Sequence, residues 1–193
     1  MDSALREESE AIASARRGDA AAFGTLVERY QEVAFRTSYL IVRDAVAAED
    51  VTQEAFIRAY RKLGSFREGE PFRPWLLRIV TNLGLNEVRA RSRRFGLLER
   101  TRVLAERRNE PAAASEVEAR DEASTLLRAV NELPADDRVV LYLRYFVELP
   151  EREIAAAIGK APGTVKSRLH RASARLREVI ETKYPQLRES VHE

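Results

Sequence analysis

The stretch "EREIAAAIGKAPGTVKSRLHRASARLR", residues 151–177, decides the fold of the C-terminal part of the chain. Ile154, Ala155 and Ile158 recur at helical spacing, and Gly159 then ends the pattern. Pro162 begins the next helix after only the three residues 159–161. Two helices joined by so short a glycine-containing turn predict a helix-turn-helix, whose second helix normally enters the major groove of DNA.

The second helix of this pair has two distinct faces. Val165, Leu169, Ala172, Leu176 and Val179 alternate at spacings of four and three, which predicts a buried stripe. The opposite face carries small and polar side chains. Thr164, Ser167 and Arg171, on the N-terminal turns, are the candidates for reading base edges, and the flanking cations suit phosphates. The candidate DNA contacts are Gly163, Thr164, Lys166, Ser167, Arg168, His170, Arg171 and Arg175.

Other roles for this helix fit the sequence less well. A basic amphipathic helix can lie on a membrane, but here the exposed face lacks an aromatic anchor and the apolar stripe is needed for packing. His170 is interpreted as a neutral groove or phosphate contact, because no second His or Cys lies nearby to build a catalytic site.

A second basic segment lies upstream, in a helix predicted to begin near Trp75, just after Pro74. A buried stripe of Leu76, Ile79, Val80 and Leu83 is expected. Displaced from this stripe, a ribbon of donors fits a sugar-phosphate backbone, and its Asn amides can both donate to and accept from a base edge. A solvated face near a linker is an equally good reading of the same pattern. The ribbon consists of Arg78, Asn82, Asn86, Arg89 and Arg93.

An acidic face appears in "AAEDVTQEAFIRAYRKL", residues 47–63. Its apolar stripe is Val51, Ala55, Ala59 and Leu63, with Phe56 and Tyr60 beside it. The residues alone favour a solvated face whose acids lie near the positive end of the helix. The polar side chains are Glu49, Asp50, Gln53 and Glu54.

Composition sets the fold class and the domain organisation. Ala, Leu, Glu and Arg dominate, and apolar residues recur at spacings of three and four, which predicts an all-α protein. The regular pattern fades between about Phe95 and Glu116, where Pro111 and small residues indicate a linker. We therefore expect two small helical domains, at residues 1–95 and 117–193, joined by a linker at 96–116. The net charge of +2 hides the two basic segments.

Several functions are disfavoured. The 193 residues include no cysteine and two histidines, and we find no glycine-rich phosphate loop, nucleophile motif or metal-ligand spacing. We therefore expect no catalytic activity, metal or cofactor. The charged N-terminus lacks the apolar core of a signal peptide and no apolar run reaches about 18 residues, so a cytoplasmic protein is expected.

The order of three motifs adds a family resemblance. "EDVTQEAF" at 49–56, "WLLRIVTN" at 75–82 and "GTVKSRLHRA" at 163–172 resemble bacterial sigma factors of the extracytoplasmic-function type, and the likeness covers most of the chain. The resemblance implies an alternative sigma factor that binds core RNA polymerase and directs it to promoters through −35 and −10 contacts. It also implies assistance in melting the promoter.

The resemblance also implies roles for particular residues. Glu49, Asp50, Gln53 and Glu54 match the surface that docks on the β′ clamp helices, and the loop from Phe66 to Arg73 matches the place where a flipped base is captured. The helix-turn-helix would bind the −35 element and contact the β flap, and an anti-sigma factor is an expected partner. The implied −10 residues are Phe66, Arg67, Arg73, Trp75, Arg78, Asn82, Asn86, Arg89, Arg91, Arg93 and Arg94.

The chain departs from the family at two positions. Asn86 stands where relatives commonly have Asp, and Pro150 where a Ser-type cap is common, although Pro suits a first helical turn. The alternative hypothesis is a helix-turn-helix repressor or response-regulator output module. It predicts palindromic sites bound without polymerase, and it gives no reason for the basic helix that begins near Trp75.

Overall fold

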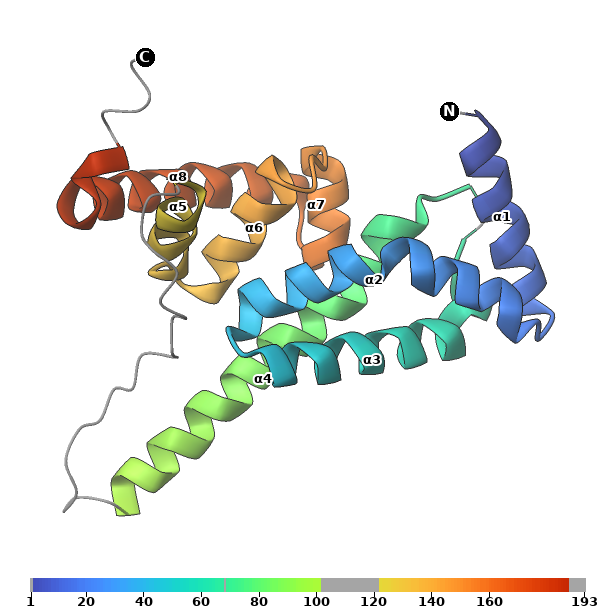
Figure 1. Cartoon of the computed structure of the whole chain (residues 1–193), viewed down its shortest axis with the longest axis horizontal. Helices are drawn as coiled ribbons and strands as arrows, with labels where there is room; N and C mark the ends of the chain where they lie inside the picture. Colours follow the sequence, from blue (N-terminus) through green and yellow to red (C-terminus); the bar gives the residue numbers. More distant parts are fainter. Residues whose placement is uncertain (1, 68, 102–121, 188–193) are drawn as a thin grey trace.

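The computed structural model describes residues 2–67, 69–101 and 122–187, which form helices and contain no strand (Figure 1). The all-α prediction is therefore confirmed. The N-terminal elements are α1 (Asp2–Arg16), α2 (Ala20–Val42), α3 (Ala45–Lys62), the 3-10 turn η1 (Leu63–Ser65) and α4 (Phe72–Thr101). The C-terminal helices are α5 (Glu122–Asn131), α6 (Ala135–Tyr145), α7 (Glu151–Ile158) and α8 (Pro162–Lys183).

Side-chain caps fix where the N-terminal helices begin. The Asp19 carboxylate accepts from the N–H groups of the first turn of α2, and Asp44 accepts from the N–H of Ala47 at 2.8 Å at the start of α3. Arg43 ends α2 in the left-handed conformation, with φ 59°. Because only Arg43 and Asp44 separate α2 from α3, the two helices turn back on each other as a hairpin.

The core of the N-terminal helices follows the predicted stripes. Val51, Ala55, Phe56, Ala59 and Leu63 of the α3 segment are buried, whereas Tyr60 is partly exposed. On α4, Leu76 and Val80 are fully buried and Ile79 and Leu83 are half-buried.

The start of α4 differs from the prediction. The helix begins at Phe72, three residues before Trp75, because Pro74 fits the first turn, where its missing N–H has no helical partner to lose. Phe72 is fully buried, so the first turn is also held by packing.

The helix-turn-helix expected from the sequence is present as α7 and α8. Gly159 adopts φ 64° at the end of α7, a left-handed conformation that glycine adopts without a Cβ penalty. Val165 and Ala172 of α8 are fully buried, and Leu169, Leu176 and Val179 are half-buried. These residues fix which face of α8 points outward.

In the sequence, Val139, Val140, Leu143 and Phe146 recur at helical spacing after Pro134, which predicts a common apolar side. For Phe146 this prediction is wrong. The side chain is 65% exposed. Phe146 is the C-cap residue that follows the last residue of α6, and the chain then turns through Glu148 at φ 57°. The helical periodicity therefore no longer applies to Phe146.

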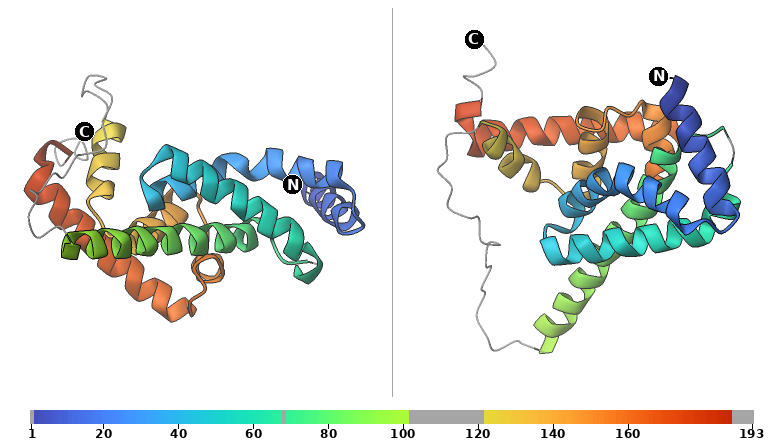
Figure 2. Two further views of the ribbon diagram at one scale, coloured as in Figure 1. Left: turned by 90° about the horizontal axis from the view of Figure 1, so that it is seen from below. Right: turned by 45° about the vertical axis from the view of Figure 1, so that its right-hand side comes forward.

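One apolar cluster joins the N-terminal and C-terminal helices. Leu40, Ile41 and Leu77 pack in the same cluster as Val139 and Val140. Helix α7 lies against α4, and α6 lies against α2 (Figures 1 and 2). The two sets of helices are therefore closed on each other.

Helix α4 continues to Thr101, past residue 96 where the linker was predicted to begin. The rest of the predicted linker, residues 102–116, lies outside the described residues. The domain limits at 95 and 117 therefore stay predictions. None of the described helices is long and apolar enough to cross a membrane.

Candidate nucleic-acid interface

The donor ribbon predicted on α4 lies on its exposed side. Its five side chains are all exposed, whereas Leu76 and Val80 on the other side are fully buried. Within the ribbon the Oδ1 of Asn86 accepts from the guanidinium of Arg89 at 3.3 Å. The structure thus presents Arg78, Asn82, Asn86, Arg89 and Arg93 as one polar strip.

Two other arginines of α4 are engaged with acids of the protein itself. Arg91 pairs with Asp44 at 3.1 Å, and Arg94 pairs with Glu87 at 2.8 Å. The N–H of Ala47 and the guanidinium of Arg91 hold the pKa of Asp44 below its usual range. Arg91 therefore ties α4 to the beginning of α3, and its charge is partly compensated before any ligand binds.

The aromatic residues at the loop before α4 pack inward. Phe66 is buried, and its ring packs edge-on against two others. The distance between ring centroids is 5.7 Å to Phe72 and 5.1 Å to Trp75. Arg16, which the sequence reasoning missed, donates its Nε to the Leu63 carbonyl at 3.0 Å and also bonds the Phe66 carbonyl. Phe66 and Trp75 thus support the loop, while Arg67 is exposed on it.

On α8 the predicted base-reading side chains are exposed. Ser167 and Arg171 interact only with backbone oxygens of their own helix, at 3.0 and 3.3 Å, among the contacts found in the described residues. Such contacts leave both side chains free to reorient. Of the eight candidate residues, the exposed ones are Gly163, Thr164, Lys166, Ser167, His170, Arg171 and Arg175.

Two further cations of the candidate set, Arg168 and Arg175, hold α8 on α6. Arg168 pairs with Asp136 at 2.9 Å, and Arg175 pairs with Asp137, whose side chain is only 8% exposed. Both pairs cross between helices that share the buried Val165 and Val139 cluster. Their geometry is that of positioning contacts, which distinguishes them from Lys166 and Arg171.

The four polar residues of α3 face away from the core. Glu49, Asp50 and Gln53 are exposed, and Glu54, which is half-buried, pairs with Arg58 at 2.6 Å within the helix. In the described ranges, no group of three or more acids or histidines is arranged to hold a metal ion. Glu49 and Asp50 thus present negative charge outward, whereas Arg58 partly compensates the charge of Glu54.

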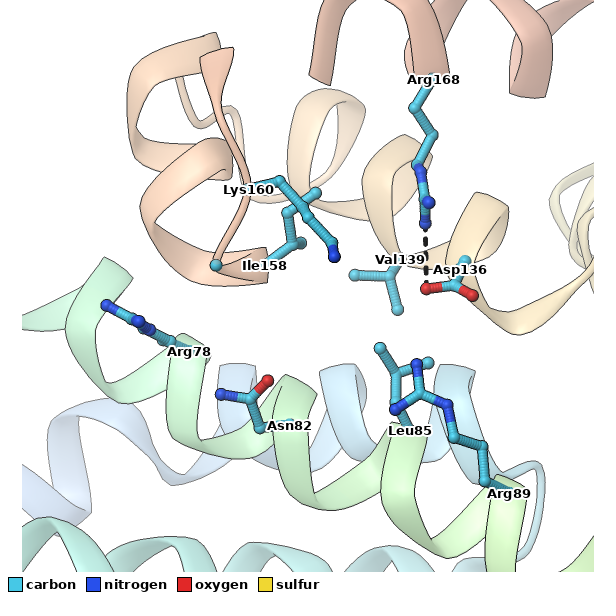
Figure 3. Close-up of a pocket in the computed structure, with 10 residues that line it drawn as sticks. Arg78, Asn82, Leu85, Arg89, Asp136, Val139, Ile158, Lys160 and Arg168 are labelled. Carbon is cyan, nitrogen blue, oxygen red and sulfur yellow. Dashed lines mark ion pairs between the residues drawn. The ribbon is translucent and has the colours of Figure 1, made fainter. Parts of the chain in front are cut away.

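A cleft of about 220 Å³ separates the α4 ribbon from the C-terminal helices (Figure 3). Asn82 and Arg89 lie on its α4 side, and Lys160 reaches into it from the turn after α7. A second cleft of about 490 Å³ lies next to the first, between the loop with Arg67 and the α7 residues Arg152 and Ala156. Helix α7 thus stands over the first half of the ribbon, an arrangement that the sequence did not predict.

Comparison with known proteins identifies the family. The chain matches family models of sigma-70 region 2 at residues 26–94 and of sigma-70 region 4 at residues 124–176. It is 36% identical to RNA polymerase sigma-H factor of Pseudomonas aeruginosa, over 95% of this chain and 97% of that protein. It is also 31% identical to the ECF (extracytoplasmic-function) RNA polymerase sigma factor SigW of Bacillus subtilis, over 88% of this chain and 94% of the relative. The chain is an extracytoplasmic-function sigma factor.

Two solved structures are similar to this sigma factor over most of its length. CnrH, in complex with the cytosolic domain of CnrY, matches with a TM-score of 0.65 and 26% identity, over 92% of this chain and 99% of CnrH. RpoE of Bartonella quintana, in complex with the anti-sigma factor NepR, matches with a TM-score of 0.63 and 26% identity, over 83% and 98% of the two chains.

The family assignment decides among the functional hypotheses. The protein is an alternative sigma factor, a transcription initiation subunit that binds core RNA polymerase and promoter DNA. Sigma factors are not enzymes, and the polymerase performs the chemistry. The repressor and response-regulator alternative is therefore set aside.

Proposed function

We propose that this sigma factor reads the −10 element with the α4 ribbon, reads the −35 element with the exposed face of α8, and docks on polymerase through the acidic face of α3. The observation that carries the proposal is the alignment of five polar side chains, from Arg78 to Arg93, along the outward side of α4. A helix rises about 1.5 Å per residue, so the ribbon is about 22 Å long. That length matches about six nucleotides at roughly 3.4 Å each.

The chemistry of the ribbon suits both capture and reading of the −10 element. Arg78, Arg89 and Arg93 supply charge to phosphates, whereas Asn82 and Asn86 can donate to and accept from a base edge. Arg67, Arg73 and the neighbouring loop supply further contacts for a base that leaves the stack, which costs a few kcal/mol. Phe66 and Trp75 act through the aromatic packing that supports this loop.

The chemistry of α8 divides its residues into two groups. Thr164, Ser167 and Arg171 address base edges, and Lys166 and His170 address phosphates or the groove. Arg168 and Arg175 act mainly by holding α8 on α6 through Asp136 and Asp137. A helix fixed in this way presents the same side chains at each binding event, which favours sequence-specific contact.

Negative charge on α3 suits a basic surface of the polymerase. Glu49, Asp50, Gln53 and Glu54 lie on α3, away from the α4 ribbon, so docking there leaves the promoter-reading face available. The C-terminal helices are the proposed contact of the β flap. Action on promoters with polymerase takes place in the cytoplasm, which is the proposed location.

An anti-sigma factor is the proposed regulator. RpoE of Bartonella quintana was solved with the anti-sigma factor NepR, and CnrH with the cytosolic domain of CnrY. The similarity of this chain to both over most of its length supports a partner of the same kind. Co-purification of such a partner that also blocks transcription in a reconstituted reaction is the corresponding test.

Single-round transcription with purified core polymerase tests the assignment of α4. Asn82→Ala is expected to reduce initiation on a fully double-stranded promoter. The reduction should be smaller on a template whose −10 region is already unpaired. Glu49→Lys with Asp50→Lys is expected to reduce both reactions, because the defect lies in polymerase docking. Arg61→Ala, an exposed change on α3, is the matched control.

The pattern of losses is decisive. If Asn82→Ala affects neither template, or if the two acidic substitutions leave polymerase binding unchanged in a direct binding assay, the corresponding surface has been assigned wrongly.

A further inference from the structure

At the interface between the N-terminal and C-terminal helices, an arginine from each set donates hydrogen bonds to backbone carbonyls of the other set. Arg138 of α6 donates its Nε to the Leu40 carbonyl at 2.6 Å and an Nη to the Ile41 carbonyl at 2.7 Å, both in the last turn of α2. In the other direction, Arg43 at the end of α2 donates to the carbonyl of Asn131, the last residue of α5, at 3.0 Å. Each half of the protein therefore caps the C-terminal end of a helix in the other half.

The chemistry of these contacts is that of helix capping. The last carbonyls of a helix lack partners within it and carry partial negative charge, so cations near them are favourable. Leu40 and Ile41 are buried, which restricts water from these oxygens when the two halves are in contact. Arg138 supplies the missing donors and is itself only 5% exposed.

The burial of Arg138 also makes the contact reversible. Its third bond goes to the Leu133 carbonyl at 2.5 Å, so all three acceptors are neutral backbone groups. Burial and the nearby charge of Arg43 lower the pKa of Arg138 to about 10. Because no carboxylate pairs with the Arg138 guanidinium, the cost of removing its charge from water is not fully offset in the closed form. Water can hydrogen-bond to the Leu40 and Ile41 carbonyls once the halves separate.

The closed interface leaves the three functional surfaces in different states. Helix α7 and the turn after it stand over the first half of the α4 ribbon, and the space left between Arg78, Asn82 and Lys160 is a cleft of about 220 Å³. We expect this narrow space to hinder a DNA strand from lying along the first half of the ribbon. The acids Glu49 and Asp50 on α3 and the base-reading residues Ser167 and Arg171 on α8 remain exposed.

We propose that Arg138 and Arg43 form a reciprocal clasp that holds the free sigma factor closed with α7 over the −10-reading ribbon, and that polymerase binding opens it. The covering of a −10-reading surface rests on the proposed assignment of α4 to the −10 element, whereas the clasp itself does not. The exposed acidic face allows the closed protein to meet polymerase first, and the ribbon becomes available afterwards.

Two substitutions separate the clasp from general stability. Arg138→Met removes the donors but retains apolar bulk. It leaves the Leu40 and Ile41 carbonyls unpaired in the closed form, and it also removes the bond to Leu133 within the C-terminal helices. Arg43→Gly removes the second donor at a position with φ 59°, where glycine is favoured, so the end of α2 is not weakened. Arg61→Ala is the exposed control on the same half.

Fluorescence energy transfer measures closure in the full chain. The protein has no cysteine, so K62C and Q186C at exposed positions provide the only labelling sites. Arg138→Met is expected to lower the ratio of closed to open protein on the order of ten-fold or more, as the loss of bonds from a charged donor implies. Arg43→Gly is expected to lower it roughly two- to ten-fold, because its single bond is solvent-exposed.

Binding of a fluorescent single-stranded −10 oligonucleotide, without polymerase, provides the second readout. Both clasp variants should bind it more tightly than the wild type, and Arg61→Ala should not. Unchanged energy transfer in Arg43→Gly, which retains its fold, overturns the clasp even if Arg138→Met fails to fold. If the variants open but do not bind the oligonucleotide more tightly, the proposal of the clasp stands and the assignment of the ribbon to the −10 element is overturned.

Discussion

The exposed cations of α8 give a quantitative prediction about promoter affinity. Lys166 is exposed on the second turn of α8, whereas Arg168 and Arg175 are paired with Asp136 and Asp137. Lys166→Ala should therefore remove one phosphate contact and lower the slope of log affinity against log salt by about 0.9. Between about 50 and about 200 mM salt, the mutant's affinity should fall roughly 3.5-fold less than that of the wild type.

Arg171→Ala should behave differently, because a contact to a base edge discriminates between sequences. Its loss is expected to remove about 1–3 kcal/mol of discrimination at one base pair of the −35 element. Lys166→Ala should weaken all promoter variants to a similar extent.

Titration of reconstituted holoenzyme on a fluorescent promoter fragment, at several salt concentrations and with single −35 substitutions, measures both effects. Lys183→Ala is the control, because this lysine pairs with Glu132 near the other end of α8. An unchanged salt slope in Lys166→Ala, or a sequence-independent loss in Arg171→Ala, refutes the proposed division of the α8 surface.

Three further predictions concern stability, each measured by chemical denaturation. Thr81 has a buried hydroxyl without a hydrogen-bond partner in the described structure, so Thr81→Val should stabilise the protein by about 1 kcal/mol, and a loss of stability contradicts this. Ile154 is fully buried, and Ile154→Ala should cost about 2–4 kcal/mol, with a change below about 1 kcal/mol inconsistent with its packing. Asp44 has a lowered pKa, so its contribution is complete above its ordinary pKa and is lost as pH falls through the lower folded value. The stability gap between wild type and Asp44→Asn should therefore close in acid, and a gap independent of pH excludes this contribution.

The sequence predicted those features that depend on local periodicity. The stripe of Val165, Leu169 and Ala172 fixed the outward face of α8, and Gly159 marked the end of α7 because a left-handed cap favours glycine. The ribbon on α4 was exposed as predicted, since its residues lie away from Leu76 and Val80. The contacts of these surfaces with polymerase and DNA remain proposals.

Features that depend on distant contacts could not be predicted in the same way. Nothing local to Arg138 shows that its acceptors are the carbonyls of Leu40 and Ile41, about a hundred residues earlier in the chain. The inward packing of Phe66 against Phe72 and Trp75 depends likewise on tertiary structure. Arginine and aromatic residues occur both in cores and at DNA interfaces, so residue type alone left their roles open.

The closed arrangement also bears on how the sigma factor avoids unproductive DNA binding. Its formal net charge is only +2, but the α4 ribbon and α8 concentrate positive charge that would attract DNA of any sequence. If α7 covers the ribbon in the free protein, as we propose, this attraction should be weaker before polymerase binds. The proposed docking of polymerase on the exposed acids of α3 would then make polymerase the first partner.

The most direct test of the two-surface account is transcription of a genomic fragment library by the reconstituted holoenzyme, with transcript 5′ ends mapped. Wild-type starts should share one −35 and one −10 element. Asn82→Ala should change preferences only within the −10 element, and Arg171→Ala only within the −35 element. Absence of promoter-specific starts, or an exchange of these two effects, would contradict the account.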